Sequence, residues 1–215
     1  MSARTQSLRG LAVGALLAVG IAAGAAPAAV HRGDARAGRA KADDERCIEC
    51  HVARDPATAQ PGDGLHALLD GQSAAYLAKQ MSDYRSGARE HVVMTLVARN
   101  LDAGDQADIL AWYAATPWRA GPGVAAAGAA QRLYGEGDPA RAVGACAACH
   151  GGAGTPPRAD TPRIAGQDAD YLAAQLTLWR SGDRHNSADP VMAASARALT
   201  DVEIKALATA IAGMN

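Results

Sequence analysis

Apolar residues recur at the spacing of an amphipathic helix in two stretches, residues 71–87 and 166–182, which match each other position by position. The same four places on the helix face are apolar in both: Tyr76, Leu77, Met81 and Tyr84 in the first, and Tyr171, Leu172, Leu176 and Trp179 in the second. Gly87 and Gly182 end these stretches, where a helix C-terminus favours a left-handed residue. The pattern therefore predicts one matching helix in each half of the chain.

The last helix of each half is predicted by its start signal. Thr200 and Glu203 have the spacing of a capping box ahead of an apolar helix face, and Asp102 occupies the matching place in the first half. Helix is also expected in the stretch that leads into each pair of cysteines, from Asp34 and from Asp138. No segment shows a sustained alternation of apolar and polar residues, so the expected fold class is all-α, with about four helices in each half.

The chain has the pattern of an internal repeat behind a leader. We expect a signal peptide at residues 1–29, one domain at residues 30–116, a Pro/Gly-rich linker at residues 117–124 and a second domain at residues 125–215. Trp118 in the linker is expected to pack between the two domains.

The first 29 residues have the features of an export signal. Arg4 and Arg9 give a basic start, an apolar run follows from Leu11 to Ala23, and the small residues around Ala28 suit cleavage. An uncleaved membrane anchor is the alternative, because the 20 residues from Leu11 to Val30 carry no charge and are about long enough to span a bilayer. Both interpretations put the rest of the chain outside the cytoplasm, and the expected location is the periplasm.

All four cysteines lie in two copies of the pattern Cys-x-x-Cys-His. This pattern is the attachment signature of c-type haem, in which both thiols bond to the haem vinyl groups and the histidine binds the iron. The prediction is two covalently bound haem c groups, held by Cys47, Cys50 and His51 in the first half and by Cys146, Cys149 and His150 in the second. A redox-active thiol pair, a shared zinc site and two disulfides are the alternatives. The repetition of the pentapeptide in matching contexts favours haem.

A methionine at the same place in each half is the candidate for the second iron ligand. Met94 follows His51 by 43 residues and Met192 follows His150 by 42, in both cases in a loop expected just before the last helix. A thioether favours ferrous iron and raises the reduction potential relative to a second histidine. Core packing is the alternative for a methionine, and His91 is the main competitor at the first iron. The other histidines are expected to be less suitable or exposed: His31, His66 and His185.

Composition restricts both the core and the partners. Aromatic residues make up 4% of the chain and phenylalanine is absent, so two small domains rich in Ala and Gly need the apolar mass of a porphyrin to fill their cores. We therefore expect the haem-free chain to be poorly folded. The net charge is −1 and no basic stripe is present, so nucleic acid is not an expected partner.

With these motifs identified, the chain resembles the dihaem cytochromes c4, which are built from two class I cytochrome c domains. The resemblance spans residues 33–213 and is clearest at residues 145–151, 162–167, 180–182 and 199–204. It implies two tandem cytochrome c-like haem-binding domains. It also implies that the carbonyl of Pro162 orients the iron-binding histidine of the second domain.

The first half departs from the family pattern. Ala67 stands at the place of the proline, Val52 follows His51 where the family has glycine, and the loop after the histidine is four residues longer than in the second half. From these differences we expect the first haem to be held less tightly and to have a different reduction potential.

The expected function is electron transfer rather than enzyme catalysis, because both axial positions of each iron are filled. The resemblance implies a periplasmic carrier between a cytochrome bc-type complex and a terminal oxidase, with transient partner contacts and a possible loose association with the membrane. Two alternatives remain. One is a cytochrome subunit of a flavocytochrome or dehydrogenase complex, and the other is a dihaem peroxidase, which needs one open iron position.

Overall fold

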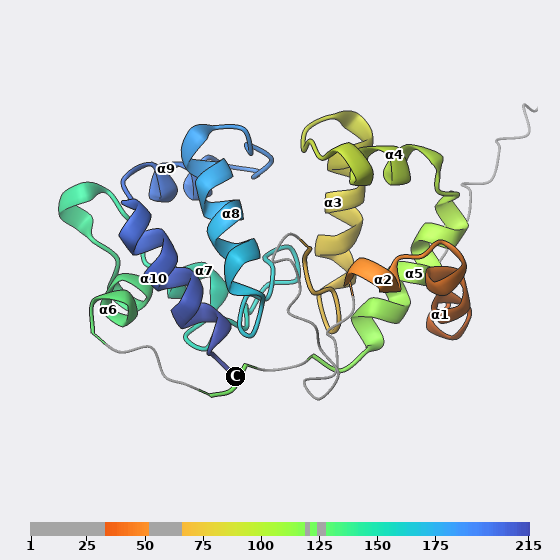
Figure 1. Ribbon diagram of the computed structural model, residues 1–215, viewed down its shortest axis with the longest axis horizontal. Coiled ribbons are helices and arrows are strands. Elements are labelled where there is room, and N and C mark those ends of the chain that lie inside the picture. Colours follow the sequence, from red (N-terminus) through yellow and green to blue (C-terminus); the bar gives the residue numbers. More distant parts are fainter. Residues whose placement is uncertain (1–32, 52–65, 119–120, 124–127) are drawn as a thin grey trace, which may run out of the picture. The chain divides into compact units, whose positions relative to one another are not determined.

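The described part of the chain is helical. The computed structural model describes residues 33–51, 66–118, 121–123 and 128–215 (Figure 1). Within these ranges the regular structure consists of helices, with one isolated bridge between Asp138 and Val143, and the predicted all-α class is confirmed. None of the helices in these ranges is long and apolar enough to cross a membrane. The leader lies outside the described residues, and the boundaries expected for the leader, linker and domains remain predictions.

The first lobe is defined as the described residues from 33 to 118. Its helices are α1 (Ala35–Asp44), α2 (Ile48–His51), α3 (Ala74–Ser86), α4 (Val92–Asn100) and α5 (Ala103–Ala115). Helix α1 packs along α5, and α3 packs on both α4 and α5. The buried core between them is small: Ala42, Leu77, Met81, Tyr84, Ala98, Ile109, Leu110 and Tyr113.

The second lobe is defined as the described residues from 121 to 215. Its helices are α6 (Ala129–Glu136), the short 3-10 helix η1 (Pro139–Arg141), α7 (Ala147–His150), α8 (Ala169–Ser181), α9 (Val191–Arg197) and α10 (Asp201–Ala212). Helix α10 packs on α8 and α6, and α9 packs on α8. The main core combines residues of these helices with Val143 and Leu199: Leu133, Tyr134, Leu172, Ile204, Leu207, Ala208 and Ile211.

The helix boundaries follow the signals in the sequence. Thr200 and Glu203 form the predicted capping box at the start of α10, with each side chain accepting a hydrogen bond from the other's backbone N–H. Asp102 caps α5 by accepting from the N–H of Gly104 at 2.7 Å. Gly87 and Gly182 end α3 and α8 in the left-handed region, with φ of 84° and 91°. These predictions are therefore confirmed.

Helices α1 and α5 approach each other so closely that one glycine is required. A Cβ atom placed on Gly38 would lie 1.9 Å from the backbone oxygen of Asp108, which leaves no room for any other residue. The buried Asp108 carboxylate ties the same two helices together, because it accepts from Lys41 Nζ at 2.5 Å and from the backbone N–H of Asp34 at 2.6 Å. The Lys41 ammonium also pairs with Asp105 at 2.6 Å. Close backbone contact and paired charges thus join the N-terminal helix to the last helix of this lobe.

One helix is misplaced in the sequence-based prediction. The helix expected from Asp138 is reduced to the short 3-10 helix η1, because α6 ends at Glu136 and a tight turn follows. Gly137 has φ of 71°, and a Cβ there would lie 2.3 Å from the Val143 oxygen. The backbone of Asp138 bonds to that of Val143 in both directions, at 2.8 and 3.0 Å, which closes the turn. Each lobe also has more helices than the four expected, because the haem-attachment pentapeptide and the methionine segment each contain a short helix.

Trp118 contacts both lobes, as predicted. Its backbone and Cβ lie so close to Gly71 that a side chain on that glycine, which has φ of 64°, would meet them within 2.9 Å. From the second lobe, the guanidinium of Arg163 lies over the indole ring, 5.3 Å from its centroid. The linker residue therefore fills the space where the two lobes approach.

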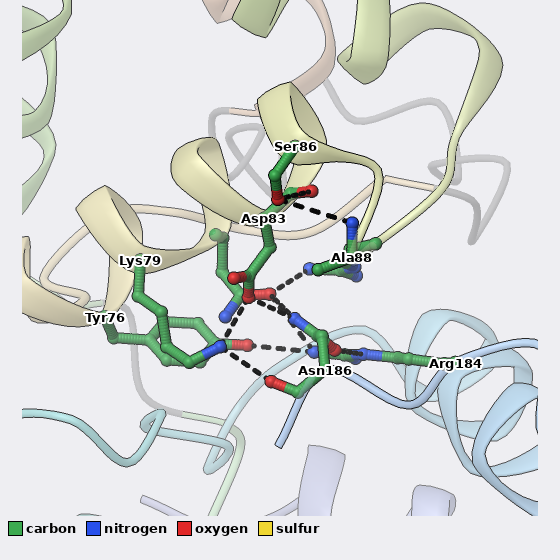
Figure 2. A network of polar contacts seen from close by, with 9 residues as sticks. Tyr76, Lys79, Asp83, Ser86, Ala88, Arg184 and Asn186 are labelled. Carbon is green, nitrogen blue, oxygen red and sulfur yellow. Dashed lines mark hydrogen bonds and ion pairs between the residues drawn. The ribbon is translucent and has the colours of Figure 1, made fainter. Parts of the chain in front are cut away.

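A network of polar side chains joins α3 to the segment that follows α8 (Figure 2). The buried Asn186 donates to Asp83 Oδ2 at 2.6 Å, and its backbone carbonyl accepts from Lys79 Nζ at 2.6 Å. Lys79 also pairs with Asp83 on the next turn of α3. Arg184 donates to the hydroxyl of Tyr76 at 3.3 Å. Figure 2 shows these groups converging from the two lobes.

Two buried arginines extend this network in a reciprocal pattern. Arg89 donates to Gln80 of its own lobe at 2.8 Å and to Gln175 of the other lobe at 2.9 Å. Arg184 donates to Gln175 of its own lobe at 2.8 Å and to Gln80 of the other lobe at 3.4 Å. The two arginines, like the two glutamines, are 95 residues apart in the sequence. The internal repeat therefore pairs equivalent positions across the interface.

Candidate haem-binding sites

The first site is built on one helical turn. Helix α1 ends at Asp44, and Arg46 adopts a left-handed conformation with φ of 60° that redirects the chain into the pentapeptide. The N–H groups of Cys50 and His51 donate to the carbonyl of Cys47 at 3.3 and 3.1 Å, which closes the turn. Two thiols and an imidazole are thereby placed within one turn of backbone, as haem attachment requires.

The second site repeats this arrangement. The N–H groups of Cys149 and His150 donate to the carbonyl of Cys146 at 3.3 and 2.9 Å. The thiols differ in exposure in the same way in both sites: Cys47 and Cys146 are half-buried, and Cys50 and Cys149 are exposed. None of the four cysteines is paired in a disulfide, which disagrees with the alternative of two disulfides.

Each histidine ring is fixed by a backbone carbonyl. His51 Nδ1 lies 2.8 Å from the oxygen of Ala67, and His150 Nδ1 lies 3.0 Å from the oxygen of Pro162. A carbonyl only accepts hydrogen bonds, so Nδ1 is the protonated nitrogen and donates, which leaves the lone pair on Nε2. Burial lowers the pKa of both histidines and favours the neutral ring. Each site thus offers a neutral imidazole with Nε2 available to a metal.

The carbonyl of Pro162 accepts a hydrogen bond from His150, as the resemblance implied. In the first lobe the carbonyl of Ala67 makes the equivalent hydrogen bond at 2.8 Å, although alanine stands where the family has proline. The backbone oxygen is present whichever side chain the residue carries, so this substitution leaves the contact intact. The expectation of a different potential for the first haem therefore loses this part of its support and stays a prediction.

The two methionines lie at equivalent places, but on helices rather than on loops. Met94 is in the first turn of α4 and packs against the core cluster that also contacts Cys47. Met192 is in the first turn of α9 and packs against Trp179, Ala193 and Ala196. The loop predicted for each methionine is therefore wrong, because the residues after it continue as a short helix. Both methionines are half-buried, and their role as iron ligands stays a prediction.

His91 has a structural role of its own. It is the N-cap of α4, where its Nδ1 accepts from the N–H of Met94 at 3.3 Å, and its side chain is exposed. This contact accounts for a histidine three residues before the methionine without any bond to iron. The choice between His91 and Met94 as the ligand of the first iron stays a prediction.

Two residues near the first site were not identified from the sequence. His66 was expected to be exposed, but it is half-buried with its ring edge-on to His51, at a centroid separation of 6.3 Å. Tyr113 is buried at 1% exposure, and its hydroxyl has no hydrogen-bond partner among the described residues. Burial raises the pKa of Tyr113. The position of His66 directly before Ala67, whose carbonyl orients His51, was the one available signal.

The residues present fit haem better than zinc. A zinc site shared by the four cysteines needs the two pairs brought together with the other ligands around one ion. No group of three or more His, Cys, Asp or Glu side chains in the described ranges is placed to hold a metal ion. Two thiols on one turn, one fixed imidazole and a small adjoining core are the features that covalent haem requires in each lobe.

Known proteins share these features. The family model described as Cytochrome c matches residues 128–214. Cytochrome c4 of Pseudomonas aeruginosa is 38% identical over 212 residues, which are 95% of this chain and 98% of that protein. A thiosulfate dehydrogenase electron acceptor of Stutzerimonas stutzeri is 38% identical over 166 residues, which are 75% of this chain and 76% of that protein.

A solved structure agrees with the sequence relatives. The structure of reduced recombinant cytochrome c4 from Pseudomonas stutzeri matches with a TM-score of 0.73 at 30% identity, over 85% of this chain and 100% of that chain. Cytochromes c4 are dihaem electron carriers rather than enzymes, and the cysteine pairs at positions 47/50 and 146/149 fit two covalently bound haem c groups. The chain therefore belongs to the cytochrome c4 family.

Proposed function

We propose that this dihaem electron carrier works in the periplasm, between a cytochrome bc-type complex and a terminal oxidase. Each iron is held by one histidine and one methionine: His51 and Met94 in the first lobe, His150 and Met192 in the second. The features of residues 1–29 support export, and those residues act as a signal peptide. The covalently held haem supplies an iron that cycles between Fe(II) and Fe(III).

One observation supports this proposal above the others. In both lobes the histidine of the pentapeptide donates from Nδ1 to a backbone carbonyl, at 2.8 and 3.0 Å. A ring held in this way keeps its orientation when the charge on the iron changes, so little rearrangement accompanies electron transfer. With haem bound, the histidine and the methionine of each lobe would both hold the iron, which would leave no position for a substrate, as suits a carrier.

The chain's own residues then perform three tasks. The carbonyls of Ala67 and Pro162 orient the imidazoles, and the thioethers of Met94 and Met192 favour the reduced iron. The apolar residues beside Cys47 and Cys146 keep water away from the site. Partner proteins exchange electrons through contacts that are small and short-lived.

A second candidate is the acceptor role in a dehydrogenase system. It is favoured by the 38% identity to a protein described as a thiosulfate dehydrogenase electron acceptor. In that case the donor is the dehydrogenase rather than a bc-type complex, and the haem chemistry is the same. Copurification of a dehydrogenase with the tagged holoprotein, and reduction of the haems by it with thiosulfate, distinguish this candidate from a general respiratory carrier.

The ligand assignment is tested by an optical redox titration of the holoprotein. We expect both haems to show the far-red band of thioether-bound ferric iron, to titrate at high potential and to bind no carbon monoxide. A haem that lacks the band and titrates low would instead have His91 or another histidine as its ligand. A haem that binds carbon monoxide would have an open position, and the peroxidase alternative would return.

A further inference from the structure

Two buried glutamines cross from one lobe to the backbone of the other. Gln72 follows Gly71 in the first lobe and Gln167 follows Gly166 in the second, and each side chain is 4% exposed. The Gln167 amide accepts from the N–H of Leu68 at 2.9 Å and donates to the carbonyl of Leu68 at 2.9 Å. Each buried amide thus engages the other lobe through both of its polar atoms.

The second crossing is equivalent to the first. The Gln72 amide accepts from the N–H of Arg163 at 2.9 Å and donates to the carbonyl of Arg163 at 3.0 Å. The positions correspond in the repeat: residues 68 and 163 are 95 positions apart, and so are residues 72 and 167. The same pair of buried hydrogen bonds therefore occurs at equivalent positions of both lobes, which indicates a part of the repeat's architecture rather than a chance contact.

The backbone N–H groups that bond to the glutamines belong to the same peptide units whose carbonyls accept from the two histidines. The peptide between Ala67 and Leu68 accepts from His51 Nδ1 through its oxygen at 2.8 Å and donates to Gln167 through its N–H at 2.9 Å. The peptide between Pro162 and Arg163 accepts from His150 Nδ1 at 3.0 Å and donates to Gln72 at 2.9 Å. A single planar peptide therefore links each histidine to a glutamine of the opposite lobe.

We propose that each lobe sets the reduction potential of the other lobe's haem through this glutamine. Gln167 is a positioning residue for His51, and Gln72 is a positioning residue for His150. The inference rests on the proposed function, because it takes these two histidines as the iron ligands.

The direction of the effect follows from hydrogen-bond cooperativity. A peptide whose N–H donates to a strong acceptor carries more negative charge on its oxygen, so it accepts more strongly from the imidazole. A more strongly held Nδ1–H makes the ring a better electron donor at Nε2 and stabilises ferric iron. Loss of the glutamine amide therefore raises the potential of the haem in the opposite lobe.

The test measures both haems in the intact holoprotein. Gln167→Met and Gln72→Met keep the side-chain length and remove the amide. Each haem is titrated by NMR, with the signals assigned to their lobes through the protons of the attached cysteines. For Gln167→Met we expect the ferrous-to-ferric ratio of the first haem, at fixed ambient potential, to rise on the order of twofold, with a smaller change at the second. Gln72→Met should show the reverse pattern.

Asn186→Ala is the matched control. It removes other hydrogen bonds between the lobes, to Gln80 at 3.0 Å and to Asp83 at 2.6 Å, without touching either peptide. If this variant shifts the two haems as much as the glutamine variants do, loosening of the interface is the cause and the inference is overturned. Equal shifts of both haems in each glutamine variant overturn it as well.

A second variant and a second readout keep the test decisive if a methionine variant does not fold. Gln167→Asn keeps an amide but shortens it by one methylene, so it no longer reaches Leu68. In a ¹⁵N-histidine sample, exchange of the His51 Nδ1–H with solvent should become faster while that of His150 is unchanged. Equal exchange rates in variant and wild type overturn the inference but leave the proposed function intact. A wild-type spectrum without histidine ligation overturns both.

Discussion

Arg141 and Glu203 form a two-pronged ion pair in which Nη2 lies 2.7 Å from Oε1 and Nη1 lies 3.1 Å from Oε2. The pair connects the turn after α6 to the first turn of α10. Glu203 also completes the capping box of α10, so one carboxylate serves both the helix start and the contact between segments. The hydrogen bond from Arg141, followed by that from the Thr200 backbone, lowers the pKa of Glu203 to about 2.

The contribution of Glu203 to the free energy of unfolding should depend on pH. A carboxyl group with a lowered pKa stabilises the fold above its unfolded-state pKa, here near 4.5, and loses this effect as the pH falls towards about 2. Glu203→Gln should therefore lower the denaturant midpoint of the holoprotein at pH 7, and the difference from wild type should shrink steadily below pH 4.5. Chemical unfolding at a series of pH values checks this, and a difference that stays constant down to pH 2 would contradict it.

Replacing a proposed methionine ligand should change one haem only. Met94→Ala should remove the far-red thioether band of the first haem, lower its potential and let it bind carbon monoxide, because one axial position opens. Met192→Ala should do the same at the second haem. Optical titration with and without carbon monoxide measures each effect.

Met81 provides the control for these variants. It is a core residue of the first lobe at 7% exposure, and Met81→Leu keeps its volume. Both far-red bands should persist in this variant. If Met94→Ala also keeps both bands, then Met94 is a packing residue and another methionine is the ligand of the first iron.

Two glycine substitutions in helices should have opposite effects. Gly38→Ala places a methyl group 1.9 Å from the Asp108 oxygen, so α1 and α5 must separate, and we expect a loss of about 2 kcal/mol or more. Among the described residues, the methyl group of Gly135→Ala in α6 meets no atom within 4 Å outside its own stretch of helix. This variant should gain about 0.5–1 kcal/mol, because alanine is the better helix former. Urea unfolding of the two holoproteins measures both values, and equal effects would show that the close approach of α1 and α5 is not maintained.

Removal of the haem groups should remove the cooperative fold. The first-lobe core has eight buried residues, two of which are alanines, so little apolar surface is left to offset chain entropy. Replacing all four cysteines by alanine prevents attachment, and we expect this chain to melt without a cooperative transition in circular dichroism. A sharp melt like that of the holoprotein would contradict the expectation.

The turns, helix ends and helix caps that depend on residues close together in the chain could be predicted from the sequence. The pentapeptides form the expected turns, Gly87 and Gly182 end their helices, and the Thr200 capping box is present, because each of these features is decided within a few residues. The α-helix expected from Asp138 fails although the contacts that prevent it are local. Gly137 lies too close to Val143 for a side chain, and the backbone closes into a tight turn that holds only the short 3-10 helix η1.

Apart from the packing of Trp118, contacts across the lobes were beyond the sequence-based prediction. Nothing in the order of residues indicates that Gln167 bonds to the backbone of Leu68, which is 99 positions away. The substitution at Ala67 was interpreted as a weakness because the family has proline there, whereas the contact uses a backbone oxygen. The family pattern indicated the equivalent carbonyl contact at Pro162, but the side chain at position 67 carries no information on whether a backbone oxygen makes the same contact.

The reciprocal pairing of Arg89 with Gln175 and of Arg184 with Gln80 has the form of an isologous interface, as in a twofold homodimer. A surface that carries both the arginine and the glutamine is self-complementary, so one ancestral lobe could associate with a second copy of itself. Joining the two copies in one chain replaces a concentration-dependent encounter by an intramolecular one. It also frees each copy to change alone, so two haem sites that began alike could acquire different potentials while the contact between them was kept.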